Sequence, residues 1–247
     1  MITDPPYGVA IGDKNKMLQE HNGGNQITEN IMNDDLPVDN LYDILVEAMS
    51  NAKEASAEDA AYYVFSPPGG DMGLMMMMMR DAGLRVRHHL VWVKNAPTFS
   101  MRRLDYDYKH EAILYTWGAR HHFYGGVSNT VFEDELDIDQ LKKDELVKIV
   151  KELLSDQRPT SVIRENKPLK NDLHPTMKPV ALIGRLMNNS SREGDIVLDL
   201  FGGSGTTMIA AEQLGRKCYM MELDPHYCDV IIARWEKLTG RTAEKIN

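Results

Sequence analysis

The residues Asp4-Pro5-Pro6-Tyr7, near the start of the chain, combine a carboxylate, two prolines and an aromatic ring. Two consecutive prolines remove two backbone N–H donors and hold φ at about −65°, so they form a rigid corner that offers carbonyl acceptors without a competing donor. Asp4 adds carboxylate oxygens before this corner, and Tyr7 adds a ring face after it. The corner is therefore suited to hold a group that donates N–H bonds.

A glycine-rich stretch, Asp199–Thr207 ("DLFGGSGTT"), follows an apolar run and opens a helical pattern, where backbone N–H groups and the positive helix end can meet a ligand. Met208 stands where a dinucleotide fingerprint needs its third glycine, and the GK[ST] of a P-loop is missing. Glu222 ends the next apolar run, where a carboxylate can accept both hydroxyls of a ribose. These residues predict a nucleoside cofactor without a pyrophosphate. The alternative, that Gly202 and Gly203 serve only a tight turn, stays open at this point.

Apolar runs and helical patterns alternate around this loop. Ile196–Leu200 predicts a strand buried on both faces of a parallel sheet, and Gly205–Leu214 predicts a helix that ends at Gly215. Lys217–Leu223 predicts the next strand, and Asp224-Pro225 combines a capping side chain with the residue favoured at the first helical position. A strand-helix-strand-helix unit of this kind is typical of a doubly wound α/β sheet.

The first third of the chain repeats this alternation. Asp4–Tyr7 end a very short predicted strand, Asn40–Ala55 has the spacing of an amphipathic helix, and "AAYYVFS" and "HHLVWVKN" predict two further strands. The run Met75–Met79 predicts a largely buried helix that covers the sheet, because methionine is a flexible core residue with good helix propensity. Residues 125–173 lack a clear strand pattern and carry one apolar stripe on a charged helix. We therefore expect one α/β core with an inserted helical segment.

The composition predicts a soluble globular protein of one sizeable domain, with 247 residues, 43% hydrophobic and 26% charged. No apolar run approaches the roughly 20 residues of a membrane span, and no secretion signal opens the chain, which predicts a cytoplasmic protein. Cys218 and Cys228 have no metal-binding spacing, which predicts a reduced, metal-free protein. The net charge of −9 argues against non-specific coating of nucleic acid, although the Lys and Arg residues of 80–120 could form a local basic face.

The motifs together resemble the S-adenosylmethionine-dependent amino-group methyltransferases of DNA. "DPPY" comes first, "HPTMKP" (His174–Pro179) precedes the glycine-rich loop, and this order is that of the β-class. "LVWVKN" and "KHEAILYTW" are similar to the middle motifs, and the closest resemblance is to phage- and mobile-element DNA modification methylases. It implies a doubly wound, Rossmann-like methyltransferase sheet, circularly permuted, with an inserted helical segment. Residues 1–124 would form the catalytic half, 125–173 an inserted segment for recognition or dimerisation, and 174–247 the cofactor-binding half.

The resemblance implies S-adenosylmethionine as the cofactor and assigns its contacts residue by residue. Asp199 would lie near the methionine amino group, and Thr176 and Lys178 near the methionine carboxylate. Glu222 would hold the ribose. The other implied cofactor-binding residues are Asp4, Phe201, Gly202, Gly203 and Ser204 on the methionine and ribose side, and Leu223 and Asp224 near the adenine ring.

The resemblance makes Asp4, Pro5, Pro6 and Tyr7 the catalytic residues. The N6 of adenine is a poor nucleophile because its lone pair is delocalised into the ring. Asp4 and the Pro5 carbonyl would accept its two N–H bonds and direct the lone pair at the sulfonium methyl, with Tyr7 stacked on the base. The adenine would first be flipped out of duplex DNA, and a direct in-line displacement would need no covalent enzyme intermediate.

Other readings of the motifs stay open. Ser66–Gly70 ("SPPGG") resembles the Ser-Pro-Pro-aromatic motif of cytosine-N4 methyltransferases but has Gly69 in place of the aromatic residue, so adenine N6 is favoured and cytosine N4 is the alternative. A non-catalytic DNA- or cofactor-binding subunit of the same fold is a second alternative. An amino-group methyltransferase that acts on RNA or another substrate is a third.

Double-stranded DNA is the implied partner, and Lys94, Arg102 and Arg103 are the predicted contacts to its phosphates. The resemblance is also compatible with a homodimer, and with an upstream ParB-like domain or a restriction partner outside this chain. Only Met1-Ile2-Thr3 precede the proline corner, where similar enzymes have a longer strand. A fragment and a natural minimal form are both compatible with that departure.

Overall fold

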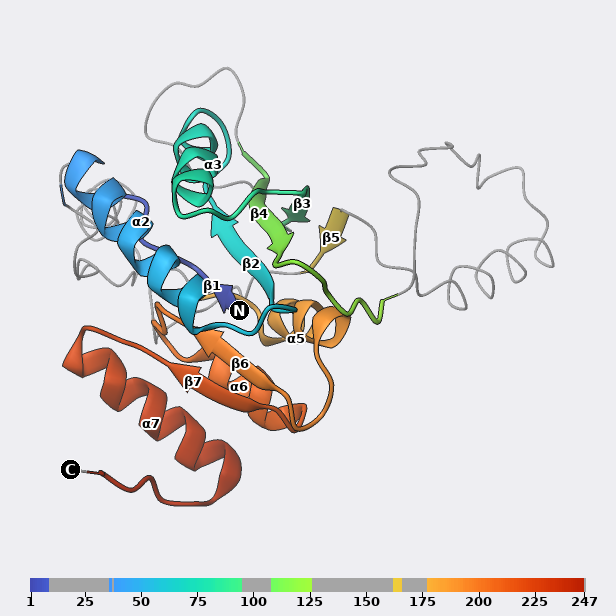
Figure 1. The fold of residues 1–247 in the computed structure, drawn as a ribbon. Helices are drawn as coiled ribbons and strands as arrows, with labels where there is room; N and C mark the ends of the chain where they lie inside the picture. The colour runs from blue at the N-terminus through green and yellow to red at the C-terminus, as the bar shows by residue number, and fades with distance from the viewer. Residues whose placement is uncertain (9–35, 37, 95–107, 126–161, 166–176, 247) are drawn as a thin grey trace, which may run out of the picture.

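Strands and helices alternate along the computed structural model, which describes residues 1–8, 36, 38–94, 108–125, 162–165 and 177–246. The strands are β1 (Ile2–Thr3), β2 (Ala61–Ser66), β3 (His88–Val93), β4 (His110–Trp117), β5 (Val162–Arg164), β6 (Ile196–Asp199) and β7 (Lys217–Met220). The helices are α2 (Val38–Ala55), α3 (Asp71–Asp81), α5 (Val180–Ser190), α6 (Thr206–Gln213) and α7 (Pro225–Thr239), as Figure 1 shows. None of the described helices is long and apolar enough to cross a membrane.

Five strands form one mixed sheet in the order β1-β2-β4-β3-β5. The pairs β1–β2 and β3–β5 are parallel, whereas β4 runs antiparallel to both of its neighbours. The parallel pair β6–β7 lies beside β1 (Figure 1). Thr3 and Asp199 are the last residues of β1 and β6, and the Thr3 Oγ1 donates a hydrogen bond of 2.9 Å to Asp199 Oδ1. The proline corner and the glycine-rich loop therefore leave the sheet at the same edge, where doubly wound sheets bind ligands.

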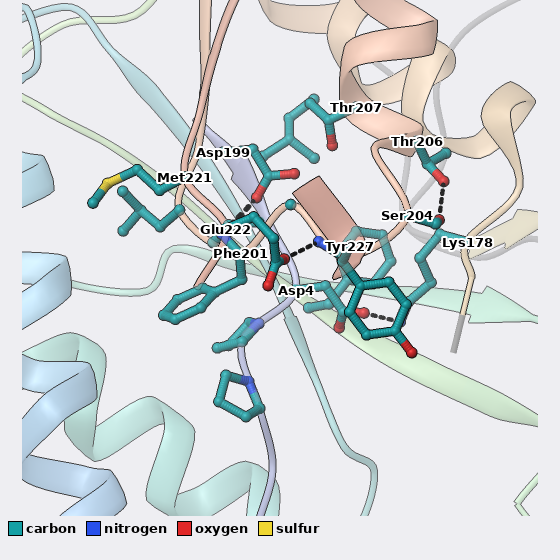
Figure 2. A pocket seen from close by; sticks show the side chains of 18 of the residues that line it. Asp4, Lys178, Asp199, Phe201, Ser204, Thr206, Thr207, Met221, Glu222 and Tyr227 are labelled. Atoms are coloured by element: carbon teal, nitrogen blue, oxygen red, sulfur yellow. Dashed lines mark hydrogen bonds and ion pairs between the residues drawn. The ribbon is translucent and has the colours of Figure 1, made fainter. Parts of the chain in front are cut away.

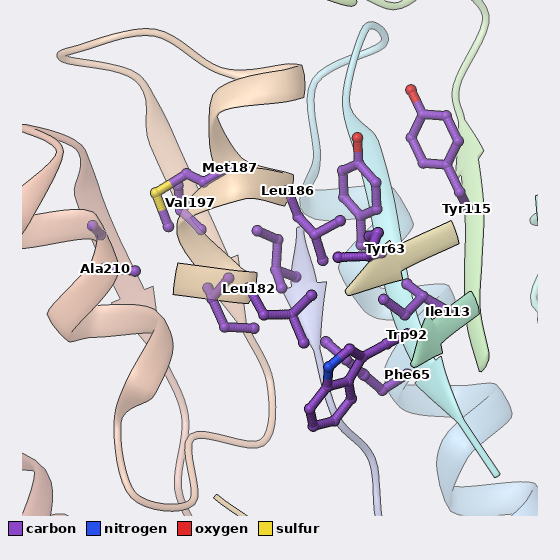
Figure 3. Packing of buried hydrophobic residues seen from close by; sticks show 14 residues of the cluster. Tyr63, Phe65, Trp92, Ile113, Tyr115, Leu182, Leu186, Met187, Val197 and Ala210 are labelled. Carbon is purple, nitrogen blue, oxygen red and sulfur yellow. The ribbon is translucent and has the colours of Figure 1, made fainter. Parts of the chain in front are cut away.

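Helices cover the sheet on both faces, as the period of two along β2 requires. Tyr63 and Phe65 point to the face where α5 packs, and Figure 3 shows Leu182 and Leu186 of this helix against them. The alternate residues of β2 point to the other face, where the cluster comprises Leu41, Leu45 and Met49 of α2 and Met75, Met78 and Met79 of α3 with Tyr62, Val64 and Leu114. The expected α/β fold with a doubly wound sheet is confirmed. The expected circular permutation stays a prediction.

The methionine helix is amphipathic and not largely buried. Met78 and Met79 of α3 are buried, but Met76 and Met77 are exposed. The reason is geometric, because a helix that lies on a sheet presents only one stripe to it and five consecutive residues go round the whole helix.

The strand before the glycine-rich loop is buried on one face only, in contrast to the expectation for Ile196–Leu200. Ile196 and Tyr219 are 65% and 60% exposed. Val197 packs in the cluster that contains Ala210 and Ala211 of α6. Within the described residues, the helix packing on the β6–β7 pair covers the face of Val197, which leaves the face of Ile196 open.

A third difference concerns residues 125–173, for which no strand is expected. Val162–Arg164 form β5 and pair in parallel with β3. Three residues are too few to establish an alternating pattern, so only the pairing with β3 reveals this strand. The predicted helix with an apolar stripe lies outside the described residues.

Candidate active site

A cavity of about 310 Å³ lies where the ends of β1 and β6 meet (Figure 2). The four residues of the proline corner line it from one side, and the loop after β6 and the segment after β7 line it from the other. Its predicted lining residues are Asp4, Pro5, Pro6, Tyr7, Lys178, Asp199, Phe201, Gly202, Gly203, Ser204, Glu222, Leu223 and Asp224. The fold thus brings two predicted motifs, separated by most of the chain, into one space.

Both carboxylate oxygens of Asp4 have partners in this cavity. The Tyr7 hydroxyl donates a hydrogen bond of 2.7 Å to Oδ1, and the Lys178 Nζ donates to Oδ2. Burial raises the pKa of Asp4; Lys178 opposes this rise, and the nearby Glu111 carboxylate adds to it. The proline corner therefore presents an acceptor that is held in place from two sides.

Lys178 is the central cation of the site. Besides its bond to Asp4, its Nζ lies 3.4 Å from Glu111 Oε2 and 5.0 Å from the centre of the Phe65 ring. Burial disfavours the charge of Lys178, but the Asp4 and Glu111 carboxylates outweigh it and raise the pKa of this amine. In the structure the charge of Lys178 is paired with the carboxylate of the proline corner. The contact of Lys178 with the methionine carboxylate of the cofactor, which the resemblance implies, stays a prediction.

Asp199 is a buried carboxyl at the start of the glycine-rich loop. Its Oδ1 accepts hydrogen bonds from the Thr3 Oγ1 at 2.9 Å and from the Phe201 N at 3.2 Å. Burial raises the pKa of Asp199 to about 7, against the effect of these hydrogen bonds, and the charge of Asp4 adds to the rise. A carboxyl in this state gains from a cationic partner, because such a partner favours the ionised form.

Glu222 joins the two loops that line the cofactor side of the cavity. Its Oε2 accepts from the Gly203 N at 2.6 Å and its Oε1 accepts from the Asp224 N at 2.9 Å. Asp224 in turn caps α7, because its side chain accepts from the His226 N at 2.9 Å. Glu222 is thus fixed by backbone donors, and a carboxylate oxygen has a further lone pair for a ligand hydroxyl.

The glycines of the loop line the cavity or adjoin it, and the packing and backbone conformation of the loop also require glycine there. A Cβ on Gly202 would meet Met220 Sδ at 2.7 Å and Ile231 Cδ1 at 3.2 Å. Gly205 has a φ of +77°, a conformation that side chains with a Cβ rarely adopt. The tight turn and the ligand cavity are therefore properties of the same backbone.

Lys94 is a correction to the predicted DNA contacts. Its side chain is buried, and its Nζ lies 2.5 Å from Glu111 Oε1. An ammonium that is paired inside the protein has no access to a DNA phosphate, so Lys94 belongs to the protein interior, beside Glu111. The predicted residues Thr176, Arg102 and Arg103 lie outside the described residues.

Several residues that line the cavity are not among the predicted site residues, and Glu111, Phe65 and Tyr227 are three of them. Glu111 lies in β4, Phe65 in β2 and Tyr227 in the first turns of α7. Glu111 leaves a signal that could have found it, because it is an acidic residue in the otherwise apolar strand "HEAILYTW". Phe65 and Tyr227 read as ordinary core residues, and only the fold places them at the cavity.

The curated relatives that are similar to this chain include two Type II methyltransferases. The Type II methyltransferase M2.DpnII of Streptococcus pneumoniae is 26% identical over 164 residues, which are 65% of this chain and 54% of the relative. The Type II methyltransferase M2.MboI of Moraxella bovis is 24% identical over 242 residues, which are 97% of this chain and 81% of the relative. The chain therefore spans about half the length of the first of these relatives.

Solved structures share the fold at low sequence identity. The structure of the M1.HpyAVI-SAM complex superposes with a TM-score of 0.57 at 20% identity, over 94% of this chain and 86% of that chain. PvuII DNA methyltransferase (cytosine-N4-specific) superposes with a TM-score of 0.61 at 16% identity, over 97% and 82%.

A family match also covers most of the chain. Residues 1–234 match the family, and this range includes the proline corner, the glycine-rich loop and Glu222. The two halves of the cavity thus fall inside one family match, and the chain belongs to the N6/N4 DNA methylase family.

Proposed function

We propose that the protein transfers a methyl group from S-adenosylmethionine to the exocyclic N6 amine of an adenine that is flipped out of duplex DNA. One observation carries this proposal: a single cavity joins Asp4 of the proline corner to Asp199 and Glu222 of the cofactor side. Membership of the N6/N4 DNA methylase family supports the reaction class.

The residues of the cavity fit the cofactor. Bound S-adenosylmethionine supplies an activated methyl group on a sulfonium. The buried Asp199 is suited to the cationic amino group of its methionine part, and Glu222 to the ribose hydroxyls. The cavity volume of about 310 Å³ lies within the range of small-molecule sites. The M1.HpyAVI complex with this cofactor, on the same fold, adds support. The other assigned walls are Phe201, Gly202, Gly203, Ser204, Leu223 and Asp224.

The proline corner prepares the amine. Asp4 and the Pro5 carbonyl accept its two N–H bonds, so the nitrogen lone pair is localised and directed toward the methyl group. The bond from nitrogen to carbon would form as the carbon–sulfur bond breaks, and the sulfur would leave as a neutral thioether. The nitrogen would then give one proton to the Asp4 carboxylate, which already accepts its N–H bond. Tyr7 stacks on the base, and Pro5 and Pro6 hold the corner without adding a donor.

DNA must present the base outside its stack, at a cost of a few kcal/mol. We propose that this takes place in the cytoplasm, where the two thiols stay reduced. A homodimer, an upstream ParB-like domain and a restriction partner stay predictions from the resemblance. The division at residues 124 and 173 into a catalytic half, an insertion and a cofactor-binding half is likewise proposed.

Cytosine N4 is the second candidate substrate. The "SPPGG" stretch follows β2 directly, and PvuII methyltransferase, whose name states cytosine-N4 specificity, shares the fold. The incomplete motif, with Gly69 at the aromatic position, favours adenine. Both amines would meet the same acceptors, so the product decides between them.

Incubation with labelled S-adenosylmethionine and mixed-sequence duplex DNA, followed by digestion to nucleosides and mass spectrometry, tests the proposal. The Asp4→Ala variant is the test variant, and Asp43→Ala, an exposed aspartate on α2, is the matched control. We expect N6-methyladenine from the parent and the control, and loss of at least 100-fold in Asp4→Ala, on the scale of one lost preorganised contact.

Each outcome of this experiment has a defined meaning. N4-methylcytosine would keep the mechanism and overturn the base. No methylated base, with the cofactor still bound, would favour a non-catalytic subunit. Methylation of RNA in a parallel reaction, without methylation of DNA, would favour the RNA alternative.

A further inference from the structure

Lys178 lies between two carboxylates at the base of the cavity. Its Nζ is bonded to Asp4 Oδ2 and is 3.4 Å from Glu111 Oε2, and all three residues line the same cavity. A lysine ammonium has three donors on a flexible four-carbon stem. The side chain can therefore serve either carboxylate through a small rotation.

Lys94 extends this pair into a chain of alternating charges. Its Nζ lies 2.5 Å from Glu111 Oε1, and the order Asp4, Lys178, Glu111, Lys94 alternates between negative and positive. Lys94 and Lys178 are 6% and 7% exposed, and each buried ion costs several kcal/mol unless it is paired. Lys94 thus stays beside Glu111 irrespective of where Lys178 is bonded.

Within this series of four charges, Glu111 and Lys94 are held by the sheet. Glu111 is opposite Trp92 in the register of β3 and β4, and the Lys94 N donates a hydrogen bond of 2.9 Å to the Lys109 O. Lys178 instead precedes α5, outside the sheet. Two paired strands therefore hold Glu111 and Lys94. Of the four charged groups, Lys178 is the one that can move.

The proposed reaction needs an oxygen of Asp4 that this arrangement occupies. The Tyr7 hydroxyl is bonded to Oδ1 and Lys178 is bonded to Oδ2. The N–H groups of Lys178 make the same kind of contact that a target amine would make. A carboxylate oxygen can accept a second bond, but the Lys178 ammonium competes with the amine for Oδ2. Transfer of Lys178 to another carboxylate would remove this competition without leaving its charge unpaired.

We propose that Glu111 is the receiving carboxylate for Lys178: as the target amine enters, the Lys178 Nζ passes from Asp4 to Glu111, and Asp4 Oδ2 becomes the acceptor of the amine. Lys94 holds the receiving carboxylate in place through its ion pair with Glu111. This inference rests on the proposed function. It makes Glu111 a positioning residue that acts through Lys178.

The kinetic test compares Glu111→Gln with Glu58→Gln, in which an exposed glutamate undergoes the same change. We expect Glu111→Gln to lower kcat/KM for DNA at least tenfold, to leave cofactor affinity within twofold, and to be partly rescued by Glu111→Asp. Glu58→Gln keeps the parent values. Equal activity of the two glutamine variants overturns the proposal. A loss of cofactor affinity as large as the loss of activity also overturns it, because Glu111 would then act on the cofactor.

A second readout is independent of methylation. The Tm change of Glu111→Gln is measured in the parent and in Lys178→Met, which forms a double-mutant cycle. We expect the loss of Tm in the Lys178→Met background to be less than half of that in the parent. Equal losses would show that the two residues are not coupled and would overturn the proposal. A parent that methylates no base refutes the proposed function itself, and the cycle still decides the coupling.

Discussion

Asp199→Asn isolates the charge of one buried carboxyl at the cofactor side of the cavity. The asparagine oxygen can still accept from the Thr3 Oγ1 and the Phe201 N, so the loop keeps both hydrogen bonds. The Thr207 side chain also bonds to Asp199, and its hydroxyl can accept from the asparagine NH₂ group, so the main change is the loss of ionisation. We therefore expect a specific change in how cofactor affinity depends on pH.

The magnitude follows from the raised pKa of Asp199, which is about 7 in the protein without cofactor. Binding of a cationic amino group requires the ionised form, so affinity falls tenfold per pH unit once the pH is well below this pKa. Between about pH 7.5 and about pH 5.5 the parent should lose roughly 25-fold in affinity, or about 2 kcal/mol. The window lies below the α-amino pKa of about 7.7–8.0, so most of the ligand carries its charge throughout.

Isothermal titration calorimetry with S-adenosylmethionine measures this slope. The parent should also release close to one proton on binding at about pH 5.5, detected by repeating the titration in buffers of different ionisation enthalpy. Asp199→Asn should bind more weakly at about pH 7.5 and show little pH dependence. Asp229→Asn, an exposed carboxyl on α7, is the control and should follow the parent.

The stability of the cofactor-free protein should depend on the ionisation of Asp199 in the opposite direction: it falls as the pH rises, whereas cofactor affinity increases. The folded pKa of Asp199 is raised above its usual value of 3.8, so its contribution to stability is full below that value and is lost as the pH rises to about 7. The Tm of Asp199→Asn relative to the parent should therefore increase over this interval. A parent whose cofactor affinity is flat with pH, or a variant that keeps the parental slope, would refute the reasoning.

Three further predictions concern the scaffold. Gly202→Ala places a Cβ against Met220 Sδ and should lower the free energy of unfolding by about 1–3 kcal/mol in urea titrations, with weaker cofactor binding by calorimetry; unchanged values would contradict the packing argument. Asp224→Ala removes the cap of α7 and should cost about 1 kcal/mol in the same titration, whereas Asp224→Asn should cost less. Met79→Ala should cost about 2–5 kcal/mol because the side chain is fully buried, while Met77→Ala, on the exposed side of α3, should cost less than about 0.5 kcal/mol; equal Tm losses would refute the one-sided packing.

The local elements follow closely from the sequence where short-range physics decides them. The helix begins at Pro225 after the Asp224 cap because that side chain accepts from a nearby backbone N–H, a contact made within three residues. The turn between β6 and α6 needs glycine at Gly205 because of its positive φ. The spacing of the apolar residues likewise predicts the alternation of strands and helices.

Which side of each strand or helix is buried depends on the neighbouring elements, and the local sequence pattern does not identify these. The apolar run at Ile196 predicts burial on both sides, and only the placement of α6 on one face leaves Ile196 exposed. The five methionines are identical in type, so which of them are buried is decided by the sheet beneath α3. The strand β5 exists because β3 is beside it.

The chemistry proposed for this protein can be predicted from its motifs: the proline corner, the glycine-rich loop and Glu222 are recognisable because their backbone geometry and donor sets depend on residue type. The partner of each buried charge, in contrast, is known only from the fold. Lys94 reads as a surface cation and Lys178 as a ligand contact, yet both are paired with carboxylates from distant parts of the chain, Glu111 and Asp4. The physical reason is burial, because an ion inside the protein must be matched by whatever opposite charge the fold brings to it.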